Sequence, residues 1–136
     1  MILTLTINPA IDRTIIADRL VFEDRGYILD RSEAAGGRGI NASQVIHSFG
    51  GKTTAILTAG GATGQRIEKL LAGRGFPYDV VRVKSESRTN LTISDKHGLT
   101  IKLNEVGHEL HAGELGEIKK RVDAHRGILA VEQRLD

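Results

Sequence analysis

The alternation of apolar and polar residues predicts a chain in which strands and helices follow one another. Residues 3–7 alternate leucine or isoleucine with threonine, which is the period of a strand, and Pro9 ends it because proline lacks a backbone donor. Residues 53–59 lack the polar alternation of a one-sided strand, which is typical of a strand covered on both faces. Residues 78–83 and 128–131 predict two further strands.

Apolar residues spaced three and four positions apart predict helices between these strands, each with one face on the core. Three stripes have this spacing: Ala42, Val45, Ile46 and Phe49; Ile67, Leu70 and Leu71; and Leu115, Ile118 and Val122. We expect Gly50 and Gly73 to end the first two helices, and Thr63 to cap the second.

Two segments do not fit the main sheet. Residues 14–29 hold short apolar pieces split by charged pairs, which predicts short strands joined by polar turns. Residues 91–103 alternate around a turn at 95–98, which predicts a hairpin. We expect both to form a separate flap. The remaining order of strands and helices predicts an α/β fold with a mainly parallel sheet covered on both faces.

Composition narrows the class of protein. The net charge is +2, aromatic residues make up 4%, and the basic residues are dispersed, whereas a nucleic-acid binder clusters them. The basic run at 119–121 is expected to be a solvated helix face. The absence of cysteine excludes disulfides, thiolate zinc sites and cysteine nucleophiles. With no apolar run of about 20 residues and no basic leader, we expect a soluble cytoplasmic protein without a nucleic-acid or membrane partner.

Candidate chemistry begins just past the first strand. Open α/β sheets bind ligands at the carboxyl ends of their strands, so Asp12 is placed to accept hydrogen bonds from sugar hydroxyls. An acidic turn residue is the alternative interpretation. Arg88 and Asn90 stand at the start of the hairpin, where Arg88 can meet a phosphate and Asn90 a hydroxyl. An exposed arginine at a sheet edge is the alternative there.

Two glycine-rich turns lead into helices. At 36–41, glycines permit close approach of a ligand, the helix start favours an anion, and Arg38 offers a fork of donors to phosphate oxygens. A plain tight turn is the alternative, and a nucleotide site at 36–39 is a weaker one, because the spacing matches neither a P-loop nor a dinucleotide fingerprint. At 60–64 we expect close packing, with nothing charged added. His108 and His111 lack a third ligand with suitable spacing, so we expect no metal site.

The order of four motifs resembles the PfkB (ribokinase-like) carbohydrate kinases, most of all their branch of 1-phosphofructokinase and tagatose-6-phosphate kinase. These motifs are Asn-Pro-Ala-Ile-Asp at 8–12, Gly-Gly-Arg-Gly-Ile-Asn at 36–41, Arg-Thr-Asn at 88–90 and Leu-Asn-Glu-Val-Gly at 103–107. The resemblance implies part of a ribokinase-like, Rossmann-type α/β sandwich. It also implies a small β-sheet lid, built from 13–33 and 88–105, that forms a homodimer clasp.

The resemblance also implies an activity: transfer of the γ-phosphoryl group of ATP, with Mg²⁺, to a hydroxyl of a phosphorylated ketohexose. Fructose 1-phosphate, fructose 6-phosphate and tagatose 6-phosphate are the implied acceptors. In this reading Asp12 holds sugar hydroxyls and Arg88 binds the acceptor's phosphate with Asn90 beside it. The pocket for the sugar phosphate would be lined by Gly37, Arg38 and Asn41.

Two departures from the family pattern change the expectation. The family commonly has lysine where this chain has Arg38, which keeps the charge but changes its geometry. Its longer chains also carry an ATP pocket and a Gly-Ala-Gly-Asp motif with the catalytic base, and no such motif occurs here. We therefore expect residues 1–136 to be an N-terminal substrate-binding part with no catalytic residue. The alternative is a non-catalytic remnant that binds sugar phosphate or self-associates through its lid.

Overall fold

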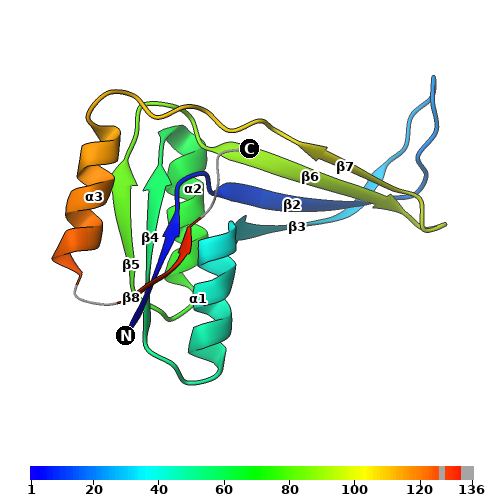
Figure 1. Ribbon diagram of the computed structural model, residues 1–136. Helices are drawn as coiled ribbons and strands as arrows, with labels where there is room; N and C mark the ends of the chain where they lie inside the picture. The colour runs from blue at the N-terminus through cyan, green and yellow to red at the C-terminus, as the bar shows by residue number, and fades with distance from the viewer. Residues whose placement is uncertain (126–127, 133–136) are drawn as a thin grey trace.

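The computed structural model describes residues 1–125 and 128–132, which form two β-sheets (Figure 1). The first is a parallel sheet with the strand order β5-β4-β1-β8. Its strands are β1 (Ile2–Thr6), β4 (Thr53–Ala59), β5 (Tyr78–Arg82) and β8 (Ile128–Glu132). These bounds confirm the four strands and the parallel sheet that the sequence predicts.

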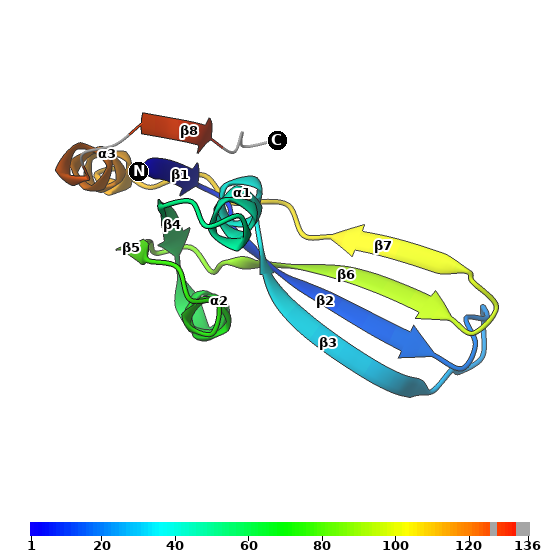
Figure 2. The ribbon, with the colours of Figure 1, turned by 90° about the horizontal axis from the view of Figure 1, so that it is seen from below.

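Helices cover both faces of this sheet, as expected. The helices are α1 (Arg38–Ser48), α2 (Gly61–Ala72) and α3 (Glu114–Ala124). Every residue of β4 is buried. Its Ala55 and Leu57 pack with α1 and α2, while Ile56 points to the other face and packs with α3. Figure 2 views the helices along their axes, with α1 and α2 on one side of the sheet and α3 on the other.

The second sheet has the order β3-β2-β6-β7 and extends away from the core (Figure 2). Its strands are β2 (Ala10–Ala17), β3 (Ile28–Gly36), β6 (Arg88–Asp95) and β7 (Thr100–Asn104). The predicted hairpin is confirmed in β6 and β7, which pair antiparallel. The prediction of short strands at 14–29 is wrong. β2 and β3 are longer strands, because their antiparallel pairing continues to Ala10 and Gly36.

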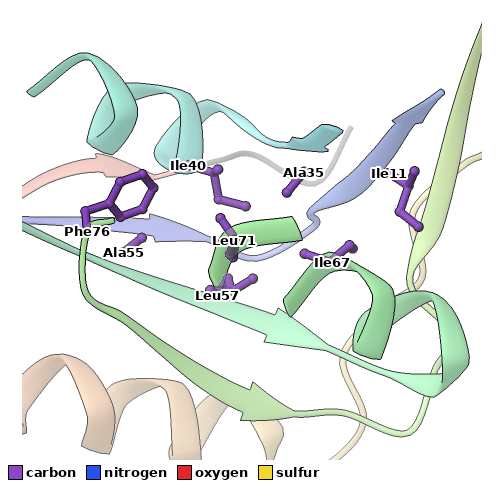
Figure 3. Packing of buried hydrophobic residues seen from close by; sticks show 8 residues of the cluster. All are labelled: Ile11, Ala35, Ile40, Ala55, Leu57, Ile67, Leu71 and Phe76. Carbon is purple, nitrogen blue, oxygen red and sulfur yellow. The ribbon is translucent and has the colours of Figure 1, made fainter. Parts of the chain in front are cut away.

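The base of the second sheet belongs to the core. Ile11 of β2 and Ala35 of β3 are buried in the same cluster as Ile40, Leu57 and Leu71. Figure 3 shows them pointing toward the side chains of the helices. The members of this cluster are Ile11, Ala35, Ile40, Ala55, Leu57, Ile67, Leu71 and Phe76. Burial of these residues therefore places their neighbours in sequence, Asp12 and Gly36, where the two sheets meet.

The predicted apolar stripe of α1 is only partly right, since Ala42 and Ile46 are half-buried. Val45 is exposed and Phe49, which follows the helix, is 88% exposed. The buried residues of α1 are instead Gly39, Ile40 and Ser43. The hydroxyl of Ser43 hydrogen-bonds those of Thr4 (2.7 Å) and Thr53 (2.8 Å), and this pairing makes a polar face suitable for burial. Periodicity counts apolar residues only, so it missed the polar part of the buried face.

Two predictions about the other helices also fail. Thr63 does not cap α2, because the helix begins at Gly61 and the N-cap is Gly60. In α3, Leu115 is exposed while Glu114 is buried, because its carboxylate accepts the backbone N–H groups of Lys84 and His111. The predicted helix ends hold, since Gly73 is the C-cap of α2 and Gly50, just after α1, has a φ of 78°. Within the described ranges, no helix has the length and apolar character needed to cross a membrane.

Candidate functional site

The candidate site lies where the second sheet joins the core. Asp12 of β2 pairs in register with Asn90 of the parallel strand β6. The side-chain amide of Asn90 donates a hydrogen bond to Asp12 Oδ1 at 3.1 Å. Asp12 was expected in the turn after β1, but it lies within a strand because β2 begins at Ala10. Its carboxylate remains exposed and can accept further hydrogen bonds.

Gly36 makes room for this carboxylate. A Cβ atom at Gly36 would lie 2.0 Å from Asp12 Oδ2, far inside the closest approach of real atoms. Gly36 was expected in a turn, but it is the last residue of β3, opposite Ala10. Its role is thus to let the Asp12 side chain lie against the β3 backbone.

Arg88 is held beside the Asp12–Asn90 pair by neutral acceptors. Its guanidinium donates to the backbone carbonyls of Asn8 (3.4 Å) and Glu105 (3.2 Å) and to Asn90 Oδ1 (3.4 Å). These distances are long for hydrogen bonds. In the part of the chain that the structure describes, Arg88 forms no salt bridge. Its charge is therefore positioned but not neutralised by a carboxylate, as an anion site requires.

The first turn of α1 adds further positive potential. Gly37 is the N-cap with a φ of 141°, a backbone conformation that favours glycine, and no side chain caps the helix. The first turn contains no acidic residue. Arg38 and Asn41 are exposed on this turn, and no hydrogen bond among the described residues joins either side chain to the Asp12 group. The structure thus brings Asp12, Arg88 and Asn90 into contact, and leaves Arg38 and Asn41 on a neighbouring element.

Gly39 sets how closely this helix approaches β1. A Cβ atom there would lie 2.6 Å from the carbonyl oxygen of Leu5 and 2.5 Å from Thr6 Oγ1. The same Thr6 hydroxyl accepts the backbone N–H of Ile40 at 3.1 Å. The helix start is therefore seated directly on the carboxyl end of β1.

Asn8 and Glu105 support the site, although neither was predicted as a site residue. Asn8 supplies a carbonyl to Arg88, and its side chain lies against Gly107, where a Cβ atom would be 1.9 Å from Asn8 Nδ2. The carboxylate of Glu105 accepts the backbone N–H of Thr89 at 3.2 Å. Both residues occur inside the motifs at 8–12 and 103–107, which was the available signal.

A pocket of about 260 Å³ lies on the second sheet, lined by Arg13, Thr89, Leu91, Leu103, Asn104 and Glu105. Side chains alternate between the faces of a strand, so Thr89 and Leu91 project opposite to Arg88 and Asn90. This pocket is therefore on the other face from Asp12. A cavity of about 20 Å³ at the carboxyl ends of the core strands, beside Asn8 and Thr58, has room for only a water molecule.

Ion pairs connect the second sheet to α2. Glu33 of β3 accepts from Arg66 of α2 at 2.9 Å and from Arg13 of β2 at 2.7 Å. These hydrogen bonds, first from Arg66 and then from Arg13, lower the pKa of Glu33. The Arg74 guanidinium also donates to the carbonyl of Ala35 at 2.7 Å. The orientation of β3 against the core is thus supported by polar contacts as well as by burial.

The remaining charged candidates have structural contacts. Lys119 and Lys120 are exposed, but Arg121 pairs with Asp79 of β5, so the basic run at 119–121 is not wholly a solvated face. The backbone N–H of His111 donates to Glu114 Oε2. Across residues 1–125 and 128–132, no three His, Cys, Asp or Glu side chains gather as a metal site would require.

Comparison with known proteins gives a family match. The family model described as pfkB family carbohydrate kinase matches residues 5–109. A 1-phosphofructokinase of Borreliella burgdorferi is 32% identical over 122 residues, covering 90% of this chain and 39% of the relative. A tagatose-6-phosphate kinase of Staphylococcus epidermidis is 30% identical over 122 residues, with the same coverage of 90% and 39%. The chain therefore spans about two fifths of the length of the curated relatives it matches.

Solved structures agree with this match. Phosphofructokinase-2 from Escherichia coli in complex with fructose-6-phosphate superimposes with a TM-score of 0.88 at 30% identity, covering 97% of this chain and 45% of that one. A putative ribokinase from Agrobacterium tumefaciens has a TM-score of 0.66 at 21% identity, covering 82% and 38%, and supports the fold alone. The ribokinase-like α/β sandwich with a small second sheet is thereby confirmed in part of its length.

Proposed function

We propose, since the chain belongs to the pfkB family of carbohydrate kinases, that it binds the phosphorylated sugar on which such a kinase acts. The proposed complete reaction moves the γ-phosphoryl group of ATP to a hydroxyl of a phosphorylated ketohexose. Fructose 1-phosphate, fructose 6-phosphate and tagatose 6-phosphate are the candidate acceptors, in keeping with the names of the relatives. Sugar phosphates and ATP are intracellular metabolites, so we place this function in the cytoplasm.

The contact between Asp12, Asn90 and Arg88 is the observation that carries the proposal. A carboxylate and an amide beside each other suit the hydroxyls of a sugar, since together they accept and donate hydrogen bonds. The guanidinium next to them has no carboxylate partner among the described residues and suits a phosphate, which it can bind through a planar fork. Gly37, Arg38 and Asn41 at the start of α1 would complete the phosphate end of the site.

We assign no ATP or Mg²⁺ site to the described residues. No cluster of acidic or histidine ligands is formed by them, and the sequence contains no Gly-Ala-Gly-Asp motif. Phosphoryl transfer depends on such positioning and charge stabilisation. We therefore propose that this chain binds the acceptor sugar phosphate and contributes no catalytic residue.

Titration calorimetry of the wild-type chain tests the proposal. We expect heat of binding with at least one of the three sugar phosphates and much weaker binding of unphosphorylated fructose, because the sugar then lacks the anion for Arg88. A chain that is folded by circular dichroism yet binds none of the three would contradict the proposal. Binding of ATP without any sugar phosphate would instead favour a nucleotide site at 36–39.

Self-association through the second sheet is a separate proposal, supported by its exposed apolar side chains. Phe22 is 96% exposed, and Tyr27, Ile28 and Leu29 are also exposed. A pocket of about 280 Å³ at the far end of this sheet is lined by Leu20, Val21, Phe22, Leu99 and Ile101. Contiguous apolar surface of this kind marks interaction sites. We propose that a second copy of the chain covers it.

Phe22→Asp is expected to shift the chain to a monomer, because a carboxylate in an apolar contact must be desolvated. Sedimentation equilibrium over a range of concentrations measures the change. Phe49→Asp is the matched control, since Phe49 is similarly exposed but lies after α1, away from the second sheet. A wild-type chain that stays monomeric at every concentration would overturn this proposal.

A further inference from the structure

Residues 83–87, the β5–β6 crossing, connect the core sheet to the second sheet and lead directly to Arg88. Within it, Ser87 exchanges two hydrogen bonds with Gly60, which lies between β4 and α2. The backbone N–H of Gly60 donates to Ser87 Oγ at 3.0 Å, and the backbone N–H of Ser87 donates to the Gly60 carbonyl at 3.0 Å. Glu86 adds a third contact, since its Oε1 accepts the backbone N–H of Thr63 at 2.7 Å.

Gly60 and Gly61 leave the space that the β5–β6 crossing occupies. A Cβ atom at Gly60 would lie 1.8 Å from the carbonyl oxygen of Ser85. One at Gly61 would lie 1.5 Å from Glu86 Oε2, and Gly61 has a φ of 65°. Residues 60–64 themselves carry no charged side chain, but the carboxylate of Glu86 from a distant segment lies directly against them.

Glu86 acts as the cap that α2 lacks within its own sequence. The N-cap Gly60 has no side chain to offer, and the first turn of α2 contains no acidic residue. A carboxylate at a helix start is stabilised by the exposed N–H groups and the helix dipole. The hydrogen bond from the backbone N–H of Thr63, with smaller contributions from the Thr63 hydroxyl and the Ala62 N–H, lowers the pKa of Glu86. The side chain is consequently charged at neutral pH.

We propose that Glu86 is a positioning residue: by capping α2 it holds the β5–β6 crossing in place, and so sets Arg88 and the second sheet relative to the core. The short path supports this. Arg88 follows Glu86 by two positions and is the first residue of β6. Pairing with Ala10 of β2 places the backbone of Arg88, whereas the long hydrogen bonds to the carbonyls of Asn8 and Glu105 hold its guanidinium only weakly. The consequence for ligand binding rests on the proposed function, whereas the geometric role does not.

Spin-label distances test the geometric role directly. The chain has no cysteine, so Lys52→Cys and Lys96→Cys introduce unique labels, one before β4 and one in the β6–β7 turn. We expect a narrow distance distribution in the parent chain and a broad or shifted one with Glu86→Ala. The distance distribution of Glu86→Gln should stay close to that of the parent chain, because its amide oxygen still accepts the Thr63 N–H. An unchanged distribution with Glu86→Ala would overturn the proposal.

Titration of the same variants with fructose 1-phosphate, fructose 6-phosphate and tagatose 6-phosphate tests the effect on the site. We expect Glu86→Ala to weaken the binding by about tenfold, equivalent to about 1.4 kcal/mol, and to have little further effect once Arg88 is alanine, because coupled residues are non-additive. Glu117→Ala, on the exposed surface of α3, is the control and should change neither readout. Equal affinity of the parent and Glu86→Ala overturns the link to Arg88.

The two experiments separate the possible failures. A parent chain that binds no sugar phosphate contradicts the proposed function, while the spin-label distances still decide the role of Glu86. If Glu86→Ala does not fold, Glu86→Asp takes its place, since it keeps the charge on a side chain too short to reach Thr63. Glu86→Asp should then broaden the distances, and a distribution like that of the parent would overturn the proposal.

Discussion

Replacing Arg88 with alanine is expected to weaken sugar-phosphate binding by about 10- to 150-fold. This follows from the loss of a charge-assisted hydrogen bond, worth about 1.5–3 kcal/mol, where about 1.4 kcal/mol is a factor of ten. The fold should survive, because Arg88 is only half-buried and binds neutral acceptors whose other contacts remain. Titration calorimetry with the three candidate sugar phosphates measures the change.

Two further variants sharpen this result. Arg88→Lys keeps the charge but loses the planar fork, so its affinity should lie between those of the wild type and Arg88→Ala. Arg82→Ala is the matched control, because Arg82 lies on β5 and pairs at the surface with Glu68. Its affinity should equal that of the wild type. If Arg88→Ala binds as tightly as Arg82→Ala, Arg88 has no part in the site.

Leu57→Ala is expected to lower the free energy of unfolding by about 2–5 kcal/mol. Leu57 is 0% exposed at the centre of β4 and packs in the cluster that also holds Ile40, Ile67 and Leu71. Truncation removes apolar burial and leaves a cavity between two helices and the sheet. Urea unfolding followed by circular dichroism measures the change through the transition midpoint.

Leu103→Ala on β7 is the control for this prediction. Leu103 is 54% exposed, so its truncation should change the free energy of unfolding by about 0.5 kcal/mol or less. Since Leu57 and Leu103 lose the same atoms, the difference between the two variants isolates burial. Equal transition midpoints would show that β4 is not the central core strand.

The local pattern of apolar and polar residues correctly predicted elements that have one kind of surroundings along their whole length. The run at 53–59 became the fully buried strand β4, and the alternation around 95–98 became the β6–β7 hairpin. The motif order also selected Asp12, Arg88 and Asn90, which the structure joins by hydrogen bonds. The strand and the hairpin were predicted correctly because each depends on residues close in sequence. The role of Asp12, Arg88 and Asn90 in a binding site stays a prediction.

The local pattern failed where a polar side chain has its hydrogen-bond partner far away in the sequence. The inner face of α1 contains Ser43, which lies outside the predicted stripe. Its hydroxyl can be buried because it hydrogen-bonds hydroxyls of two different strands. Glu86 caps α2 in place of Thr63, although 23 positions separate Glu86 from Thr63. Periodicity and capping rules are local, so they cannot detect either contact.

The sequence by itself determined the alternation of strands and helices, the parallel core sheet, the hairpin and the identity of the residues that form the candidate site. Only the tertiary structure decided where those residues lie. Asp12 belongs to the second sheet because Ile11 beside it is buried in the core cluster, and Gly36 is needed because the Asp12 carboxylate occupies the space of its side chain. The segment leading to Arg88 likewise contacts Gly60 and Thr63 through hydrogen bonds of Ser87 and Glu86. Such contacts form between segments far apart along the chain, so they stabilise the fold only once the two sheets have come together.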